Sequence, residues 1–208
     1  MLNFPSLPML LLSIPAVLWA ITFHEFCHGY ASYKLGDPTA YMRGRLTLNP
    51  LAHLDPIGAL MLLLFRFGWA KPVPIDPRYY KKPRRDILIV SVAGVAGNIA
   101  TAIVVGLLVR LIPLSFLKNF AVFMFIQMMI LINIGLAVFN LIPIPPLDGS
   151  KLLYPLIPRT MLKHYYWLER YGMFVLMALL FLGVLQGIMG PIVGLIYHMV
   201  LPGYMWLF

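Results

Sequence analysis

Residues 24 to 28 read HEFCH and lie within a long apolar stretch, SIPAVLWAITFHEFCHGYASY. An α-helix places residues i and i+4 on one face, so His24 and His28 point the same way and can offer two nitrogens to one metal ion. Glu25 lies one step round the helix, where its carboxylate can reach water activated by that metal. The pattern predicts two metal ligands and a general base on one helical turn.

The same residues could instead form a polar cluster that hydrogen-bonds to a neighbouring helix or lines a water-filled cavity. Ionisable groups are costly in a lipid-spanning helix and are usually functional there, which favours the metal site. Cys27 is the only cysteine, so the chain has no internal disulfide. It projects about 100° away from His28, and we expect it to pack as a small hydrophobic side chain.

The composition is that of an integral membrane protein. Hydrophobic residues make up 61% of the 208 residues and charged residues only 11%, whereas a soluble domain has about a quarter of its residues charged. The N-terminal apolar run has no positively charged start and no cleavage site of small residues. We therefore expect it to stay as a first membrane helix and not to act as a signal peptide.

Four apolar segments are long enough to cross a bilayer, which takes about 20 residues; they are roughly 8–33, 87–112, 119–142 and 171–189. The segment 57–65 is apolar but too short to cross, so we expect it to be re-entrant or interfacial. The tail from residue 191 could be a further span, a half-helix or an interfacial helix. Without internal repeats, residues 1–208 are predicted to form one all-α polytopic membrane domain with four to six transmembrane helices and a short extended loop region.

The lysines and arginines predict the orientation of these helices. Ten lie in the region 34–85 and four in 148–170, whereas the opposite side has only Arg110, near the end of the second apolar segment, and Lys118. Cytoplasmic loops carry the positive excess, so both basic regions are predicted to face the cytosol in a multi-pass protein of the cell membrane. This distribution accounts for the net charge of +9 without nucleic acid as a partner.

A catalytic zinc needs three protein ligands and one open position, and no histidine or glutamate follows His28 within a few residues. Asp148 is the most suggestive third ligand, because the prolines of NLIPIPPLDG, 140–149, stop the third span and let the chain turn back. Alternatively, Asp148 could only cap a short helix that starts at Ser150. The other candidates are His53, Asp55, His164, Glu169 and His198.

HEFCH and NLIPIPPLDG together resemble the two motifs of the site-2 protease family of intramembrane zinc metalloproteases. The sequence from the first motif onward is similar to the compact bacterial and archaeal branch of the family, which has no PDZ domain. The similar stretches are HEFCHGYASYKLGDPTAYMRGRLTLNPLAHLDPIG and FGWAKPVPIDP. The resemblance covers most of residues 20–155. One departure is Val95, which stands in AGVAGN, 93–98, where the family has a proline. This departure affects helix geometry and leaves the chemistry unchanged.

The resemblance implies His24, His28 and Asp148 as ligands of one zinc ion per chain, with Glu25 as the catalytic glutamate. Asn140 matches a family asparagine that helps to bind the substrate or the oxyanion. The implied activity is hydrolysis of a peptide bond in or near the transmembrane segment of a membrane-protein substrate. The position of His24, ~10 residues or ~15 Å of helix before Lys34, predicts a zinc site nearer the cytosolic side of the bilayer.

Several secondary assignments follow from the residues. Asn98 is expected to hydrogen-bond to another helix. His53 and Asp55 could orient a metal ligand or could hydrogen-bond within their own loop. The extended pieces 43–50 and 70–77 could pair with an unwound substrate as an added strand.

Two other functions stay open. A metal-ion transporter would use the histidines as a transit site, but it predicts inverted repeats and several charges along a membrane path. An inactive homologue would bind membrane proteins without cutting them, and the intact HEFCH motif argues against it. The substrate and the oligomeric state are not encoded in any recognisable pattern.

The orientation can be tested with Lys82→Cys and Lys163→Cys, which place thiols in the two basic regions. Both thiols should be protected from an impermeant thiol reagent added to intact cells, because these regions face the cytosol. Lys118→Cys, on the opposite side, should be labelled in the same experiment. Labelling of both basic regions from outside would reverse the orientation.

Overall fold

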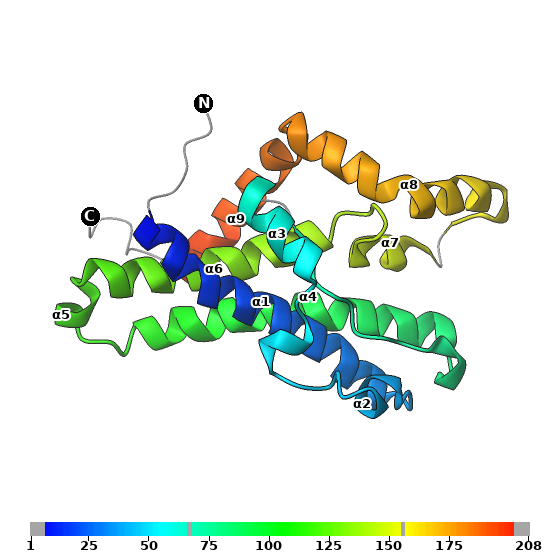
Figure 1. The fold of residues 1–208 in the computed structure, drawn as a ribbon, viewed down its shortest axis with the longest axis horizontal. Helices are drawn as coiled ribbons and strands as arrows, with labels where there is room; N and C mark the ends of the chain where they lie inside the picture. The colour runs from blue at the N-terminus through cyan, green and yellow to red at the C-terminus, as the bar shows by residue number, and fades with distance from the viewer. Residues whose placement is uncertain (1–6, 66–67, 155–156, 202–208) are drawn as a thin grey trace. The chain divides into compact units, whose positions relative to one another are not determined.

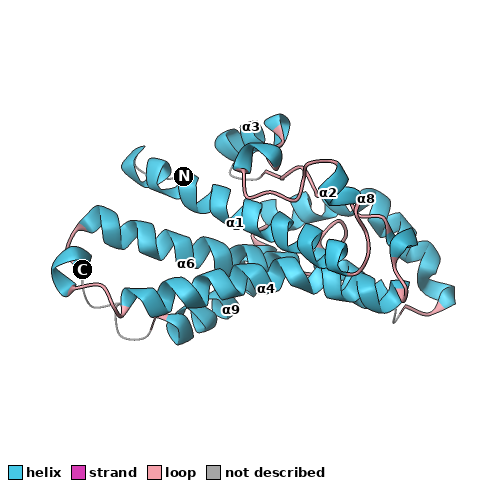
Figure 2. Ribbon diagram, turned by 90° about the horizontal axis from the view of Figure 1, so that it is seen from below, coloured by secondary structure: helices cyan, strands magenta, loops and turns pink. Residues whose placement is uncertain are grey.

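The computed structural model describes residues 7–65, 68–154 and 157–201. Within these ranges Figure 2 shows helices joined by loops, and the only strand-like pairing among them is an isolated bridge between Leu54 and Ala70. Three of the described helices are long and apolar enough to cross a membrane: Pro8–Lys34, Pro83–Val109 and Phe120–Asn140. The prediction of an all-α polytopic membrane protein is confirmed.

The chain divides into two compact units. One unit contains residues 18–97, and the other contains residues 1–17 and 98–208. Helix α1 (Leu7–Lys34) and helix α4 (Pro83–Val109) each contribute residues to both units. That residues 1–208 act as a single membrane domain stays a prediction.

Short elements and loops connect α1 to α4 in the unit 18–97. They are listed in chain order as α2 (Thr39–Met42), η1 (Pro50–Ala52), α3 (Pro56–Phe65) and η2 (Pro77–Tyr79). Helix α3 begins where the Asp55 carboxylate accepts a hydrogen bond of 2.8 Å from the Gly58 amide, with Pro56 in the first helical position. Its ten residues confirm a helix too short to cross a bilayer, and its re-entry into the membrane stays a prediction.

One face of α1 carries a run of stacked aromatic rings. The ring centroids of Trp19 and Phe23 lie 5.3 Å apart, those of Phe23 and Phe26 6.3 Å apart, and those of Phe26 and Tyr30 5.8 Å apart. Spacings of three and four residues place these side chains along one helical stripe. His24 and His28 lie outside this stripe, about half a turn round the helix.

The other unit contains the later half of α4 and most of the remaining helices. These are α5 (Leu114–Leu117), α6 (Phe120–Asn140), α7 (Asp148–Leu153), η4 (Arg159–Met161), α8 (Leu162–Phe181) and α9 (Val184–Val200). Helix α9 packs along α6 (Figure 1). A core cluster includes Ala102 and Val109 of α4, Ile130 and Ile134 of α6, and Leu201 just after α9. Between α4 and α6, the Asn98 amide donates to Asn133 Oδ1 over 2.9 Å, as expected for an amide in an apolar span.

The predicted span 171–189 is wrong as a single helix. Helices α8 and α9 are bent by 77° at the break between them. Gly183 has a φ of 73°, and this left-handed conformation ends α8 because it cannot continue a right-handed helix. If the bent pair counts as one span, the described residues contain four candidate spans. This is the lower end of the predicted range of four to six.

The turn after α6 is tightly packed. A Cβ atom on Gly149 would meet the carbonyl oxygens of Leu141 and Ile142, and one on Gly172 of α8 would meet the carbonyl oxygen of Pro145. Only glycine permits such close backbone contact. As predicted, the third span ends where the proline-rich segment begins, and a short helix, α7, follows this segment. That the chain turns back into the membrane here stays a prediction.

Candidate metal centre

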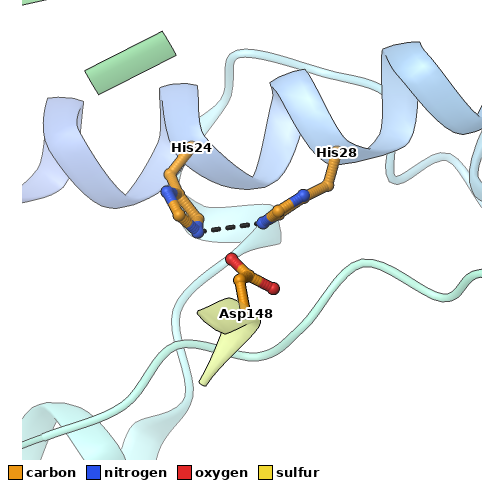
Figure 3. A group of neighbouring side chains, drawn as sticks. All are labelled: His24, His28 and Asp148. Carbon is orange, nitrogen blue, oxygen red and sulfur yellow. Dashed lines mark hydrogen bonds between the residues drawn. The ribbon is translucent and has the colours of Figure 1, made fainter. Parts of the chain in front are cut away.

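His24 and His28 form a buried pair on α1. Their side chains project from the same side of the helix (Figure 3), and their Nε2 atoms lie 2.9 Å apart. The residues are only 5% and 6% exposed. The spacing of four residues therefore brings two imidazole nitrogens to one point, as the sequence predicts.

The ring of His28 is oriented by α4. Its Nδ1 atom lies 2.6 Å from the backbone carbonyl oxygen of Val90. A carbonyl oxygen can only accept a hydrogen bond, so Nδ1 carries the proton and Nε2 keeps its lone pair. A metal-binding histidine characteristically donates its other N–H in this way.

Gly94 of α4 leaves room for both rings. A Cβ atom at this position would lie 2.7 Å from His24 Cε1 and closer still to His28 Nε2. One turn further along α4, a Cβ on Gly97 would lie 2.5 Å from Cys27 Sγ, so Cys27 packs against α4 as a small side chain. The two glycines allow α4 to approach the HEFCH turn.

The two histidines fit a zinc ion. In a tetrahedral site with Zn–N bonds of about 2.0–2.1 Å, two ligand nitrogens are roughly 3.3 Å apart, which is close to the observed 2.9 Å. Any side chain at position 94 would collide with the two rings. The donor set and the fixed tautomer of His28 suit a metal ion.

Glu25 lies next to the histidines and has a separate hydrogen bond. Its side chain is half-buried, and its Oε2 atom accepts a hydrogen bond of 2.7 Å from the Val73 amide. Val73 is 5% exposed and approaches α1 at Gly29, where an added Cβ would lie 3.1 Å from Val73 Cγ1. A carboxylate held in one orientation can accept a proton at a defined place.

Asp148 belongs to the other unit and does not cap its helix. Helix α7 begins at Asp148 itself, and its N-cap residue is Leu147, without a side-chain capping bond. The alternative that Asp148 serves as the cap is therefore wrong. The residue is 4% exposed, and its Oδ1 atom lies 3.0 Å from Lys151 Nζ.

Asn140 is the last residue of α6 and is half-buried. Its Nδ2 atom donates a hydrogen bond of 3.0 Å to the carbonyl oxygen of Leu136. A side-chain amide has two N–H groups, so this bond fixes the amide and leaves its second N–H able to donate. That geometry is compatible with a substrate contact.

The remaining candidates have other environments. The His53 ring is fully buried and its Nε2 lies 2.9 Å from the carbonyl oxygen of Thr47, whereas Asp55 caps α3. These contacts favour the loop role that the sequence left open. His164, Glu169 and His198 are exposed and do not offer a buried ligand.

The structure thus brings together His24, His28 and Glu25 within the unit 18–97. Asp148 and Asn140 lie in the other unit, and their participation in the same site stays a prediction. Sequence reasoning missed the roles of Val90, Gly94 and Val73 as neighbours of the motif. Of these three residues, only Val73 could have been recognised from the sequence. Prolines on both sides make its N–H the single backbone donor of the tripeptide PVP.

Comparisons with known proteins agree with this chemistry. The family model for Peptidase family M50 matches residues 115–183, a range that includes Asn140 and Asp148. The chain is 39% identical over 165 residues to "Putative zinc metalloprotease YwhC" of Bacillus subtilis, covering 77% of this chain and 75% of the relative.

A second relative is "Putative zinc metalloprotease Rip2" of Mycolicibacterium smegmatis. It is 33% identical over 156 residues, which cover 72% of this chain and 59% of the relative. No solved structure matches the chain. The identity to the Bacillus relative extends over most of both proteins, and the chain therefore belongs to peptidase family M50, the site-2 protease family of zinc metalloproteases.

Proposed function

We propose that this chain is an intramembrane protease that binds one zinc ion through His24, His28 and Asp148 and cleaves membrane-protein substrates. The observation that carries the proposal is the buried pair of imidazoles, whose Nε2 atoms lie 2.9 Å apart on an apolar helix long enough to span a bilayer. Such groups are costly in a membrane unless they have a function.

Asp148 is the best third ligand among the residues that the sequence nominated. It is buried, carries a carboxylate that is not needed as a helix cap, and follows the proline-rich segment. Two histidines and one carboxylate are a common ligand set for catalytic zinc. His164, Glu169 and His198 are exposed to the surroundings, which makes them weaker candidates.

In the proposed reaction a zinc ion at this site supplies Lewis-acid activation of water and of the scissile carbonyl. Glu25 accepts the proton of the attacking water and later gives it to the leaving amine. The free N–H of Asn140 donates to the developing oxyanion. Val90 holds His28 in the tautomer that leaves its Nε2 lone pair available.

The substrate of such a site is a peptide bond in or near a transmembrane helix. Helical carbonyls are occupied by internal hydrogen bonds, so the substrate must unwind before cleavage. We place the site nearer the cytosol, because only about ten residues, or ~15 Å of helix, separate His24 from Lys34 at the end of α1.

Zinc content tests the ligand set. Purified protein should contain about one zinc per chain, and His24→Ala, His28→Ala and Asp148→Ala should each deplete it. Metal analysis by mass spectrometry gives the ratio. Full zinc in Asp148→Ala, with loss in His53→Ala or Asp55→Ala, would identify a different third ligand.

Gly94→Ala tests the space beside the two rings. We expect a severalfold lower zinc content, because the new methyl group would occupy the position next to His28 Nε2 and His24 Cε1. Gly135→Ala on α6 is the matched control, since a Cβ there meets nothing within 4 Å. Equal zinc content in the two variants, measured together with their melting temperatures, would show that the methyl group is accommodated.

Glu25→Gln separates metal binding from chemistry. Glutamine keeps the size of glutamate and can still accept the Val73 hydrogen bond, but it cannot take the proton from water at neutral pH. Zinc should remain, whereas cleavage should fall by about 10²–10⁴, and uncut substrate should co-purify with the variant. A wild-type cleavage rate in this variant would exclude the protease mechanism, and altered metal flux without accumulated substrate would favour a transporter.

A further inference from the structure

The loop before η2 passes beside α1 at Glu25. We call residues 71–76, KPVPID, the strap. Its Val73 amide donates to Glu25 Oε2 over 2.7 Å, and Val73 packs against the buried Gly29 one turn further along α1. The general base of the proposed mechanism is thus in direct contact with a loop that carries none of the predicted ligands.

The chemistry of the strap makes this contact specific. Pro72 and Pro74 have no N–H group, so Val73 supplies the only backbone donor between residues 72 and 74. Their rings also restrict φ and keep the segment extended. A shift by one residue in either direction would present a proline to Glu25 and lose the hydrogen bond.

The strap is fixed at its first residues by two contacts. The Lys71 amide donates to the carbonyl oxygen of His53 over 2.9 Å. The guanidinium of Arg45 donates to the carbonyl oxygens of Lys71 and Pro72 over 2.7 and 3.2 Å. These bonds hold the strap immediately before Val73.

The other end is fixed by Asp37, which is fully buried just beyond α1. Its carboxylate accepts hydrogen bonds of 2.8 Å from the Asp76 amide and the Ser32 hydroxyl, and one of 2.9 Å from the Thr39 amide. Ser32 uses its only proton on Asp37, so the Tyr80 hydroxyl, 2.6 Å away, donates to Ser32 Oγ.

The charge of Asp37 supports this arrangement. Burial alone would raise the pKa of Asp37, but the hydrogen bonds from Thr39, Asp76 and Ser32 outweigh burial and hold the pKa below the usual value. The carboxylate is therefore ionised at neutral pH and can accept from all three donors. Hydrogen bonds to a charged acceptor are stronger than those between neutral groups.

The lengths of the two segments match. From Glu25 to Ser32, seven helical residues rise by ~10 Å at 1.5 Å each. From Val73 to Asp76, three extended residues span ~10 Å at about 3.3 Å each. The strap can therefore contact Glu25 through Val73 and reach Asp37, which Ser32 binds, through Asp76 without a bend. The Asp37 anchor thus determines where Val73 lies along the helix.

We infer that Asp37 is a positioning residue, which fixes the strap so that the Val73 amide orients the Glu25 carboxylate for proton transfer. Three of the four N–H groups in the strap, those of Lys71, Val73 and Asp76, are used within the chain. The strap therefore offers few backbone N–H donors to an added substrate strand. This argues against the sequence-based suggestion that residues 70–77 could pair with an unwound substrate. The inference rests on the proposed role of Glu25.

Asp37→Asn tests the anchor, because asparagine keeps the size of aspartate but turns an NH2 group towards one of the three donors. Arg78→Gln is the control. It removes an exposed ion pair with the Asp76 side chain and leaves in place the three donors that hydrogen-bond to Asp37, which include the Asp76 backbone amide. Both variants are made in the full-length, zinc-loaded protein.

Hydrogen exchange measured on a peptide covering 70–79 reports the strap directly, since Pro72, Pro74 and Pro77 leave few amides in it. We expect exchange about tenfold faster in Asp37→Asn than in the wild type, and unchanged exchange in Arg78→Gln. Unchanged exchange in Asp37→Asn would show that Asp37 does not fix the strap.

Cleavage kinetics test the consequence for Glu25. The probe is a fluorogenic single-span peptide that the wild type cuts and Glu25→Gln does not. Misplacement of a catalytic group by about 1 Å can cost on the order of 10² in rate, so we expect kcat of Asp37→Asn to fall by about 10- to 100-fold. KM and zinc content should stay within about twofold, because substrate contacts and ligands are untouched.

Two outcomes would overturn the inference. One is a wild-type kcat in Asp37→Asn combined with faster exchange, and the other is a loss of zinc in proportion to the loss of kcat.

If Asp37→Asn does not fold, Gly29→Ala replaces it, because its methyl group would lie 3.1 Å from Val73 Cγ1 and displace the strap from α1. A severalfold lower kcat with full zinc supports the inference, and an unchanged kcat contradicts it.

If no peptide probe is cut faster by the wild type than by Glu25→Gln, the proposed function fails. Hydrogen exchange of the peptide 70–79 still tests whether Asp37 fixes the strap.

Discussion

The hydrogen bond from the His28 ring to the Val90 carbonyl oxygen, 2.6 Å long, is the contact on which the rest of the candidate site depends. A carbonyl in the middle of a helix normally accepts from the amide four residues later, but it has a second lone pair that a side chain can use. An imidazole can reach that lone pair only if the helices approach closely. Gly94 and Gly97 provide this approach, because a Cβ at either position would collide with side chains of α1. Close packing thus fixes one tautomer without introducing another ionisable group into the apolar region.

Glu25, as the proposed general base, needs both orientation and access. A general base must be held in place, yet it must remain accessible to water and substrate. A second side chain buried against it would block access, whereas a backbone amide occupies little space. The strap meets both needs, since its prolines leave only the Val73 donor facing the carboxylate. Gly29 is required on α1 for the same reason, because a larger residue would push Val73 away. The motif and the strap therefore depend on each other although almost fifty positions separate them in the chain.

Local patterns predicted those features that depend on local geometry. The spacing of His24 and His28 follows from the helical repeat, the prolines after Asn140 end α6, and Asn98 pairs with another amide inside an apolar span. The error at 171–189 also has a local cause, because a glycine in the left-handed conformation interrupts an apolar run that hydropathy alone treats as continuous. The contacts of Val90, Gly94 and Val73 could not be predicted, since they depend on how closely segments far apart in the sequence approach. Composition records the glycines and prolines but not their partners.

These contacts also bear on the choice between a protease and a metal transporter. A transit site must release its ion, so its ligands gain little from being locked into one orientation. Here the His28 ring is fixed by a backbone carbonyl and the adjacent carboxylate by a backbone amide, and both partners belong to regular or proline-restricted backbone. Rigid positioning lowers the cost of reaching a transition state in which a proton must move between defined atoms. The arrangement is better suited to a resident ion and a fixed general base than to a site from which metal departs at each turnover.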